Sequence, residues 1–97
     1  MDKIFKGKRG ADGSMQVTCD GKPLKLRSDI VHRVDKQSQL AVSILAAAAT
    51  DEIAIQHYQS FQTHLLSRLP DEWELTEVQI AEFIMLYCVG SRLLHSF

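Results

Sequence analysis

The chain has 97 residues, of which 45% are apolar and 24% are charged, and its formal net charge is −1. This length and composition are typical of a single modest core, so we expect residues 1–97 to form one domain. The longest apolar run, "LAVSILAAAAT", is too short to cross a bilayer. The first residues show no charged segment followed by an apolar core and a cleavage site, so we expect that the protein is not secreted. Cys19 and Cys88 show no CxxC spacing, which favours a cytoplasmic protein with reduced thiols.

The charges are divided unevenly along the chain. Residues 1–36 contain nine Lys and Arg against five Asp and Glu (+4), and residues 37–97 contain two against seven (−5), which sum to −1. The basic part is suited to phosphates or an acidic protein; alternatively, the two parts attract each other or are solvated. The expected helices carry few cations, so we expect no nucleic-acid partner.

The first 26 residues are predicted to form β-structure. "KIFKGKR" is a short strand candidate, "ADGS" supplies turn residues, and "MQVTC" alternates apolar and polar side chains. Asp20-Gly21 predicts a two-residue type I′ turn, because such a turn needs positive φ at both positions. "KPLKL" returns as a strand, and Pro23 favours a sheet edge because proline cannot donate a hydrogen bond. We expect an antiparallel sheet of two or three strands that needs helices packed on one face.

A basic linker of residues 27–37 leads into a first helix that is predicted to begin near Ser38. The free N–H groups and positive dipole of a helix start, beside cations, are the elements of an anion site. Alternatively, Ser38 or Asp35 caps the helix and the basic residues are solvated. The candidate anion-binding residues are Arg27, His32, Arg33, Lys36, Ser38 and Gln39.

Three helices are predicted within residues 38–97. Thr50, followed by two acidic residues, marks the break between the first and second helices. Pro70 is expected to end the second helix, and "DEWE" is expected to form an exposed loop. Thr76 and Gln79 then have the spacing of a capping box at the start of the third helix. The predicted fold class is α+β, a small N-terminal antiparallel sheet packed on three α-helices.

No catalytic or metal-binding pattern is present in the sequence. The chain has no HExxH, CxxC, GxSxG, Walker or dinucleotide-binding motif. His57 and His64 share a helix face, but two turns separate them by about 10 Å, which is too far for two ligands of one metal ion. We therefore expect no enzymatic activity, no metal ion and no cofactor.

Two surfaces of the predicted helical region are candidates for binding a protein. An acidic face is predicted to bind a partner through Glu72, Glu74, Glu77 and Glu82. The segment "FIMLYCVGSRLLHSF" is apolar around more than one helix face, which favours a homodimer. The expected dimer interface consists of Met85, Leu86, Val89, Leu93, Leu94 and Phe97.

An ordered set of motifs over residues 4–84 resembles a family of small uncharacterised proteins found in phages and mobile elements. The motifs are an aromatic-x-Gly-Arg-Arg-like opening to a Val-rich hairpin, a Gln-Leu-Ala helix start, a Tyr-x-x-Phe helix and a Leu-Pro…Trp-x-Leu-Thr connection. The matching positions are Phe5, Gly7, Arg9, Val17, Leu24, Gln39, Leu40, Ala41, Tyr58, Phe61, Leu69, Pro70, Trp73, Leu75 and Thr76. Many relatives carry a glycine-rich segment before the Gln-Leu-Ala helix, where this chain has "IVHRVDKQS". The resemblance implies a viral or mobile-element context.

Together these features predict a non-enzymatic phage or mobile-element protein that binds and inhibits a host factor. A host defence complex is the natural target, so we expect an anti-CRISPR-like or other anti-defence inhibitor in the host cytoplasm. Its glutamates would mimic the charge of nucleic acid against a basic surface. The alternative is a module that sequesters a nucleotide-like anion with the basic linker and the start of the first helix.

Overall fold

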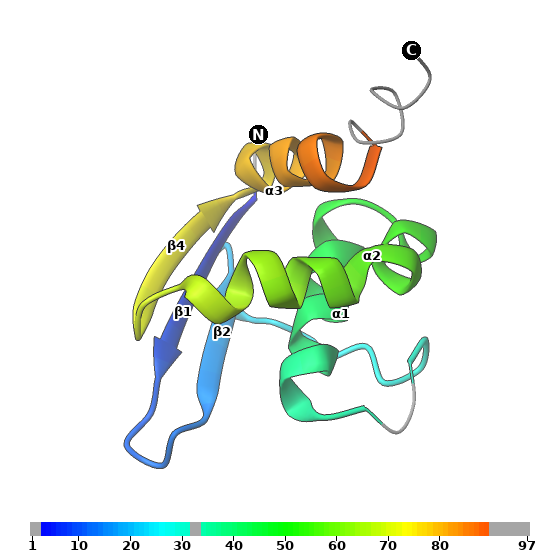
Figure 1. The fold of residues 1–97 in the computed structure, drawn as a ribbon. Helices are drawn as coiled ribbons and strands as arrows, with labels where there is room; N and C mark the ends of the chain where they lie inside the picture. The colour runs from blue at the N-terminus through cyan, green and yellow to red at the C-terminus, as the bar shows by residue number, and fades with distance from the viewer. Residues whose placement is uncertain (1–2, 32–33, 90–97) are drawn as a thin grey trace.

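The computed structural model describes residues 3–31 and 34–89, and for residues 87–89 it describes the backbone only. The strands are β1 (Ile4–Arg9), β2 (Met15–Cys19), β3 (Lys22–Pro23) and β4 (Glu72–Thr76). The α-helices are α1 (Lys36–Ala48), α2 (Asp51–His64) and α3 (Glu77–Phe83). A 3₁₀ turn, η1 (Leu66–Arg68), follows α2, and a π-helical segment, η2 (Ile84–Val89), continues α3 (Figure 1). The predicted α+β class is confirmed.

The four strands form one antiparallel sheet in the order β3-β2-β1-β4. The turn between β2 and β3 has φ of 54° at Asp20 and 82° at Gly21, as a type I′ turn requires. Pro23 lies in β3 at the sheet edge, as its missing N–H predicts. β1 is central, and Phe5 lies between Cys19 of β2 and Leu75 of β4.

The fourth strand corrects two sequence-based expectations. "DEWE" was expected to be an exposed loop, but residues Glu72–Thr76 form β4 and pair with β1. The sheet therefore has four strands, and one of them comes from the C-terminal half of the chain. β4 alternates exposed glutamates with the buried Trp73 and Leu75, which is the period of a strand with one buried face.

The helix boundaries differ from the expected ones at two places. α1 begins at Lys36, earlier than the expected Ser38, because the Asp35 side chain accepts the backbone N–H of Ser38. α2 ends at His64, well before Pro70, and the chain continues through the 3₁₀ turn η1. The predicted cap of α2 by Thr50 is confirmed.

The capping box at the start of α3 is also confirmed. The Thr76 hydroxyl accepts the N–H of Gln79 at 3.1 Å, and the Gln79 side chain accepts the N–H of Thr76 at 2.9 Å. Two backbone donors at the helix start are thereby satisfied reciprocally.

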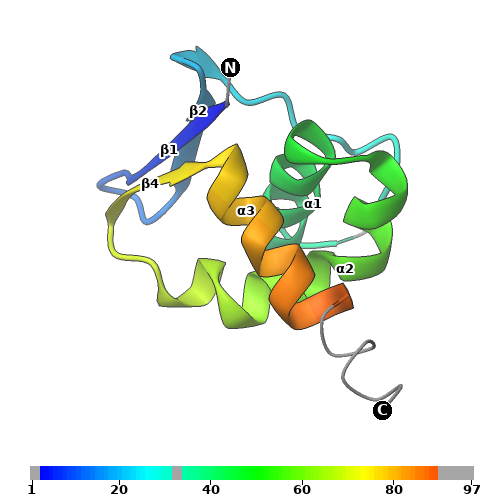
Figure 2. The same ribbon diagram turned by 90° about the horizontal axis from the view of Figure 1, so that it is seen from above.

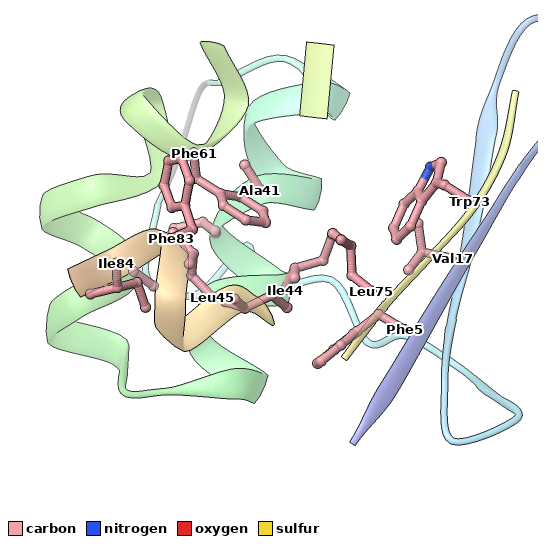
Figure 3. Close-up of a cluster of buried hydrophobic side chains, with 13 residues drawn as sticks. Phe5, Val17, Ala41, Ile44, Leu45, Phe61, Trp73, Leu75, Phe83 and Ile84 are labelled. Carbon is pink, nitrogen blue, oxygen red and sulfur yellow. The ribbon is translucent and has the colours of Figure 1, made fainter. Parts of the chain in front are cut away.

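The helices lie on one side of the sheet, and the core fills the space between these two layers (Figures 1 and 2). Figure 3 shows Phe5, Val17, Trp73 and Leu75 projecting from the strands toward Ile44 of α1. Within the helical layer, the rings of Phe61 and Phe83 meet edge to face with centroids 5.5 Å apart. The other fully buried side chains of the core include Ala41, Val42, Leu45, Ala54 and Ile80.

Candidate functional site

The predicted anion-binding residues do not gather at one place in the fold. The Arg27 guanidinium donates to the carboxylates of Asp29 and Asp51 at 2.9–3.0 Å, and its backbone N–H donates to the Ser43 hydroxyl at 2.8 Å. These hydrogen bonds raise the pKa of Arg27, and they lower the pKa of the Asp29 carboxyl. Arg27 therefore connects the linker to Asp51, the first residue of α2, and not to the start of α1.

The start of α1 is satisfied from within the chain. Asp35 accepts the N–H of Ser38 at 2.7 Å, and this bond lowers the pKa of the Asp35 carboxyl. The hydroxyl of Ser38 donates to Gln62 of α2 at 2.8 Å, and the N–H of Gln39 donates to the Asp35 carbonyl at 3.0 Å. His32 and Arg33 lie outside the described residues, so among the expected set Lys36 is the cation that the structure places at this end of α1.

A cavity of about 370 Å³ lies beside Lys36, between the inner face of the sheet and the α1–α2 pair. Apolar side chains of Met15, Leu40 and Leu66 contribute to its walls. Its polar lining includes Arg9, Lys36, Gln37 and Gln62, and Trp73 also lines it. Ligand sites in proteins commonly combine an apolar wall with a few polar groups in this way and span a similar volume.

Trp73 occupies its place because the residue opposite it is glycine. Gly7 of β1 pairs with Trp73 of β4, and a Cβ at Gly7 would overlap the indole atoms Cε2, Cζ2 and Nε1. The indole therefore packs directly against the backbone of Gly7 in the central strand, and only 8% of the Trp73 surface is exposed. The sequence signal for this arrangement is the alternation of apolar and polar residues in "EWELT", which outweighs the loop predicted for "DEWE".

Arg9 is held at the mouth of the cavity by the β1–β2 turn and the start of β4. Its Nε donates to the Asp71 carboxylate at 3.0 Å, and its Nη1 donates to the Gly13 carbonyl at 3.1 Å. The Arg9 backbone N–H also donates to the Asp71 carbonyl at 2.8 Å. Because the Nη2 group has no bond among these, Arg9 retains donors for another acceptor.

The structure brings together only two of the four glutamates of the expected acidic face. Glu72 and Glu74 project from the outer face of β4, opposite Lys8 and Lys6 of β1, with N···O distances of 3.9 and 4.0 Å. The side chains of both pairs are more than half exposed. This face therefore carries alternating charges, and the lysines partly neutralise the two glutamates.

The other two glutamates of that set lie on α3 and do not share its surface. Glu77 accepts the backbone N–H of Lys3 at 3.1 Å, so its carboxylate helps to hold the N-terminal strand. Glu82 is exposed. Five positions separate the two residues, which places them on different sides of the helix.

The outer edge of β4 carries backbone groups that no other strand of the sheet pairs. The N–H of Arg9 donates to the Asp71 carbonyl, and the N–H of Glu77 donates to the Lys3 carbonyl, so odd-numbered residues of β4 face β1. The N–H and C=O groups of Glu72 and Glu74 consequently point away from the sheet. Because β4 is the last strand in the order β3-β2-β1-β4, no strand within residues 3–31 and 34–89 pairs with these groups, and we call them the free edge of β4.

Of the expected dimer interface, the structure describes the side chains of two residues. Met85 is 63% exposed and Leu86 is 70% exposed, on the segment that continues α3. The side chain of Val89 and the residues Leu93, Leu94 and Phe97 lie outside the described part of the structure.

Within residues 3–31 and 34–89, no group of three His, Cys, Asp or Glu side chains is arranged to hold a metal ion. No helix in the same part of the chain is both long and apolar enough to span a membrane.

Residues 5–86 match the model of a family described as "Family of unknown function (DUF6166)". This chain belongs to that family. The match covers all of the sheet except Ile4, and it covers the three α-helices and the cavity-lining residues. No curated protein and no solved structure matches the chain.

Proposed function

We propose that this DUF6166 protein is a small non-enzymatic interaction protein of a phage or another mobile element. It binds a host factor in the cytoplasm of the host cell and inhibits that factor, in the manner of an anti-CRISPR or other anti-defence protein. The mobile-element context rests on the resemblance of the ordered motifs, and the binding mode rests on the free edge of β4.

The free edge of β4 is suited to the addition of a strand from a protein partner. An extended segment laid along β4 would satisfy the outward N–H and C=O groups of Glu72 and Glu74. The carboxylates of Glu72 and Glu74 would then face the outer side of the added strand, as they already face Lys8 and Lys6 on β1. A partner strand with Lys or Arg at alternate positions would repeat this pairing, so the partner segment is expected to be basic.

This mode refines the idea that the glutamates imitate nucleic acid. A mimic of nucleic acid presents one sign of charge over a broad surface, whereas the outer face of this sheet alternates Lys and Glu. Strand addition needs only two carboxylates at the correct spacing, together with unpaired backbone groups.

Self-association is a second part of the proposal. Met85 and Leu86 are adjacent, large and mostly exposed, and their burial against a second copy would remove apolar surface from water. We propose that the protein is a homodimer through this segment, which leaves the β4 edge of each subunit open.

The experiment that tests the proposal compares wild-type protein with the double variant Glu72→Lys/Glu74→Lys. Tagged proteins are incubated in bacterial lysate, and the captured proteins are identified and quantified by mass spectrometry. The matched control is Glu52→Lys, which reverses an exposed charge on α2. Surface ion pairs contribute at most about 1 kcal/mol each, so the double variant should stay folded.

We expect the wild type and the control to capture one host protein in stoichiometric amount, and we expect the double variant not to capture it. We also expect the isolated host protein to lose activity when the wild-type protein is added. Equal capture by the double variant would refute the β4 edge as the binding surface. Absence of any stoichiometric partner would refute the interaction function itself.

A second candidate function is the binding of a small anion. The observation that favours it is the cavity lined by Arg9 and Lys36, because both are cations and Lys36 was among the predicted anion-binding residues. In this case the anion would lie against the sheet, and the Arg27–Asp51 pair would have a structural role.

A further inference from the structure

We propose that the cavity between the sheet and the α1–α2 pair binds a small molecule that combines a flat apolar ring with one acidic group. This inference rests on the second candidate function and assigns to it a site and a ligand class. The carrying observation is the lining of the cavity, which places the indole of Trp73 and apolar side chains beside the cations Arg9 and Lys36.

The indole N–H of Trp73 is available to a ligand. Trp73 is more than nine-tenths buried, yet no described residue accepts a hydrogen bond from its Nε1. Every buried side-chain N or O atom in the described part of the chain has a hydrogen-bond partner, so Nε1, which has none, keeps some contact with solvent. Figure 3 shows this nitrogen on the side of the ring away from Phe5. A ligand oxygen that enters the cavity would give this N–H an acceptor.

The walls of the cavity are suited to the apolar ring. Met15, Leu40 and Leu66 provide aliphatic and thioether surface, and the indole provides a flat aromatic one. Trp73 cannot turn toward the strand beneath it, because it already lies against the backbone of Gly7. A planar ring can therefore lie against a rigid aromatic group without ordering a flexible side chain.

The mouth of the cavity is suited to the acidic group. Arg9 retains unbonded guanidinium donors, and no described residue accepts a hydrogen bond from the Lys36 ammonium group. Asp71 and Asp12 lie near these two cations and reduce the net positive charge. An isolated phosphate would therefore gain little here, and the apolar ring must supply much of the binding free energy.

Trp73 is the only tryptophan of the chain, so all of the indole fluorescence comes from the wall of this cavity. The probe is 1-anilinonaphthalene-8-sulfonate, an aromatic sulfonate, and the signals are quenching of Trp73 and sensitised emission of the probe. We expect saturable binding of one probe molecule per chain. Inorganic phosphate at the same concentration should neither quench Trp73 nor displace the probe.

Three single variants locate the binding. Lys36→Glu reverses a cation at the mouth, and Ser67→Phe places a ring at an exposed position of the cavity lining. Lys36→Glu removes a charge-assisted contact to the sulfonate, and Ser67→Phe blocks access to the cavity. Each variant should therefore raise the dissociation constant of the probe by about tenfold or more. The control Lys22→Glu reverses a cation on β3, away from the cavity, and should leave the dissociation constant within about twofold.

The outcomes distinguish a wrong binding site from a wrong function. If the probe or phosphate binds with unchanged affinity in Lys36→Glu and Ser67→Phe, the cavity is refuted as the site while anion binding itself stands. If Met85→Lys abolishes probe binding instead, the probe occupies the exposed apolar surface after α3, and the cavity is likewise refuted. If neither the probe, phosphate nor a nucleoside monophosphate binds, both the inference and the second candidate function are refuted.

Discussion

The substitution Gly7→Ala tests the packing on which the sheet and the cavity both depend. A methyl group at Gly7 would overlap the indole ring of Trp73, which is itself fixed by the core. Overpacking of this kind costs about 1–3 kcal/mol. Gly7 does not have positive φ, so alanine can adopt the same backbone conformation. Alanine also lowers the conformational entropy of the unfolded chain, which stabilises the folded protein by about 0.4–1 kcal/mol and offsets part of this cost. We expect the free energy of unfolding to fall by about 1–2 kcal/mol.

The assay is urea unfolding followed by far-ultraviolet circular dichroism. A small domain unfolds with a slope of about 1 kcal/mol per molar urea, so the midpoint should fall by about 1–2 M. The companion variant Trp73→Leu removes the ring, and in that background Gly7→Ala should cost nothing or stabilise the protein slightly. The reasoning is wrong if Gly7→Ala leaves the midpoint unchanged or raises it, or if its cost persists in full without the indole.

The remaining predictions concern the core, the helix start and self-association. Phe61→Ala removes a fully buried ring that contacts Phe83, and it should lower the free energy of unfolding by about 3–5 kcal/mol in urea titrations. Asp35→Ala should lower the urea midpoint at neutral pH, because the bond from Ser38 lowers the pKa of Asp35 below its ordinary value of 3.8. That stabilisation is complete above the ordinary pKa and is lost as the pH falls through the lowered one, so the difference between wild type and Asp35→Ala should vanish in strong acid. Leu86→Lys should convert a dimer into a monomer in light scattering at micromolar concentration; a monomeric wild type would contradict the proposed dimer.

The features that sequence reasoning predicted correctly are local ones. The type I′ turn at Asp20-Gly21, the Thr50 cap and the Thr76–Gln79 capping box each depend on residues within four positions of one another. Their hydrogen bonds and φ values are set by the side chains of that short stretch, whatever the rest of the chain does. The α+β class follows from the same local periodicities.

The features that it missed depend on partners far away in the chain. "EWELT" becomes a strand because β1, nearly 70 residues earlier, offers its free edge, and five residues in isolation cannot favour that pairing over a loop. Arg27 was assigned to the start of α1, yet its partner is Asp51 at the start of α2, 24 positions later. Ion pairs over such separations become visible only when the backbone has brought the groups together.

The sequence by itself determined the turns, the caps and the apolar stripes, because these follow from short-range sterics and hydrogen bonding. The tertiary structure alone decided that Gly7 lies beneath Trp73, that Glu72 and Glu74 border an open sheet edge, and that a cavity lies beside Lys36. Each of these depends on how the sheet and the helices close on one another. Both candidate binding surfaces therefore depend on the pairing of β1 with β4, which joins strands from the N-terminal and C-terminal halves of the chain in one sheet.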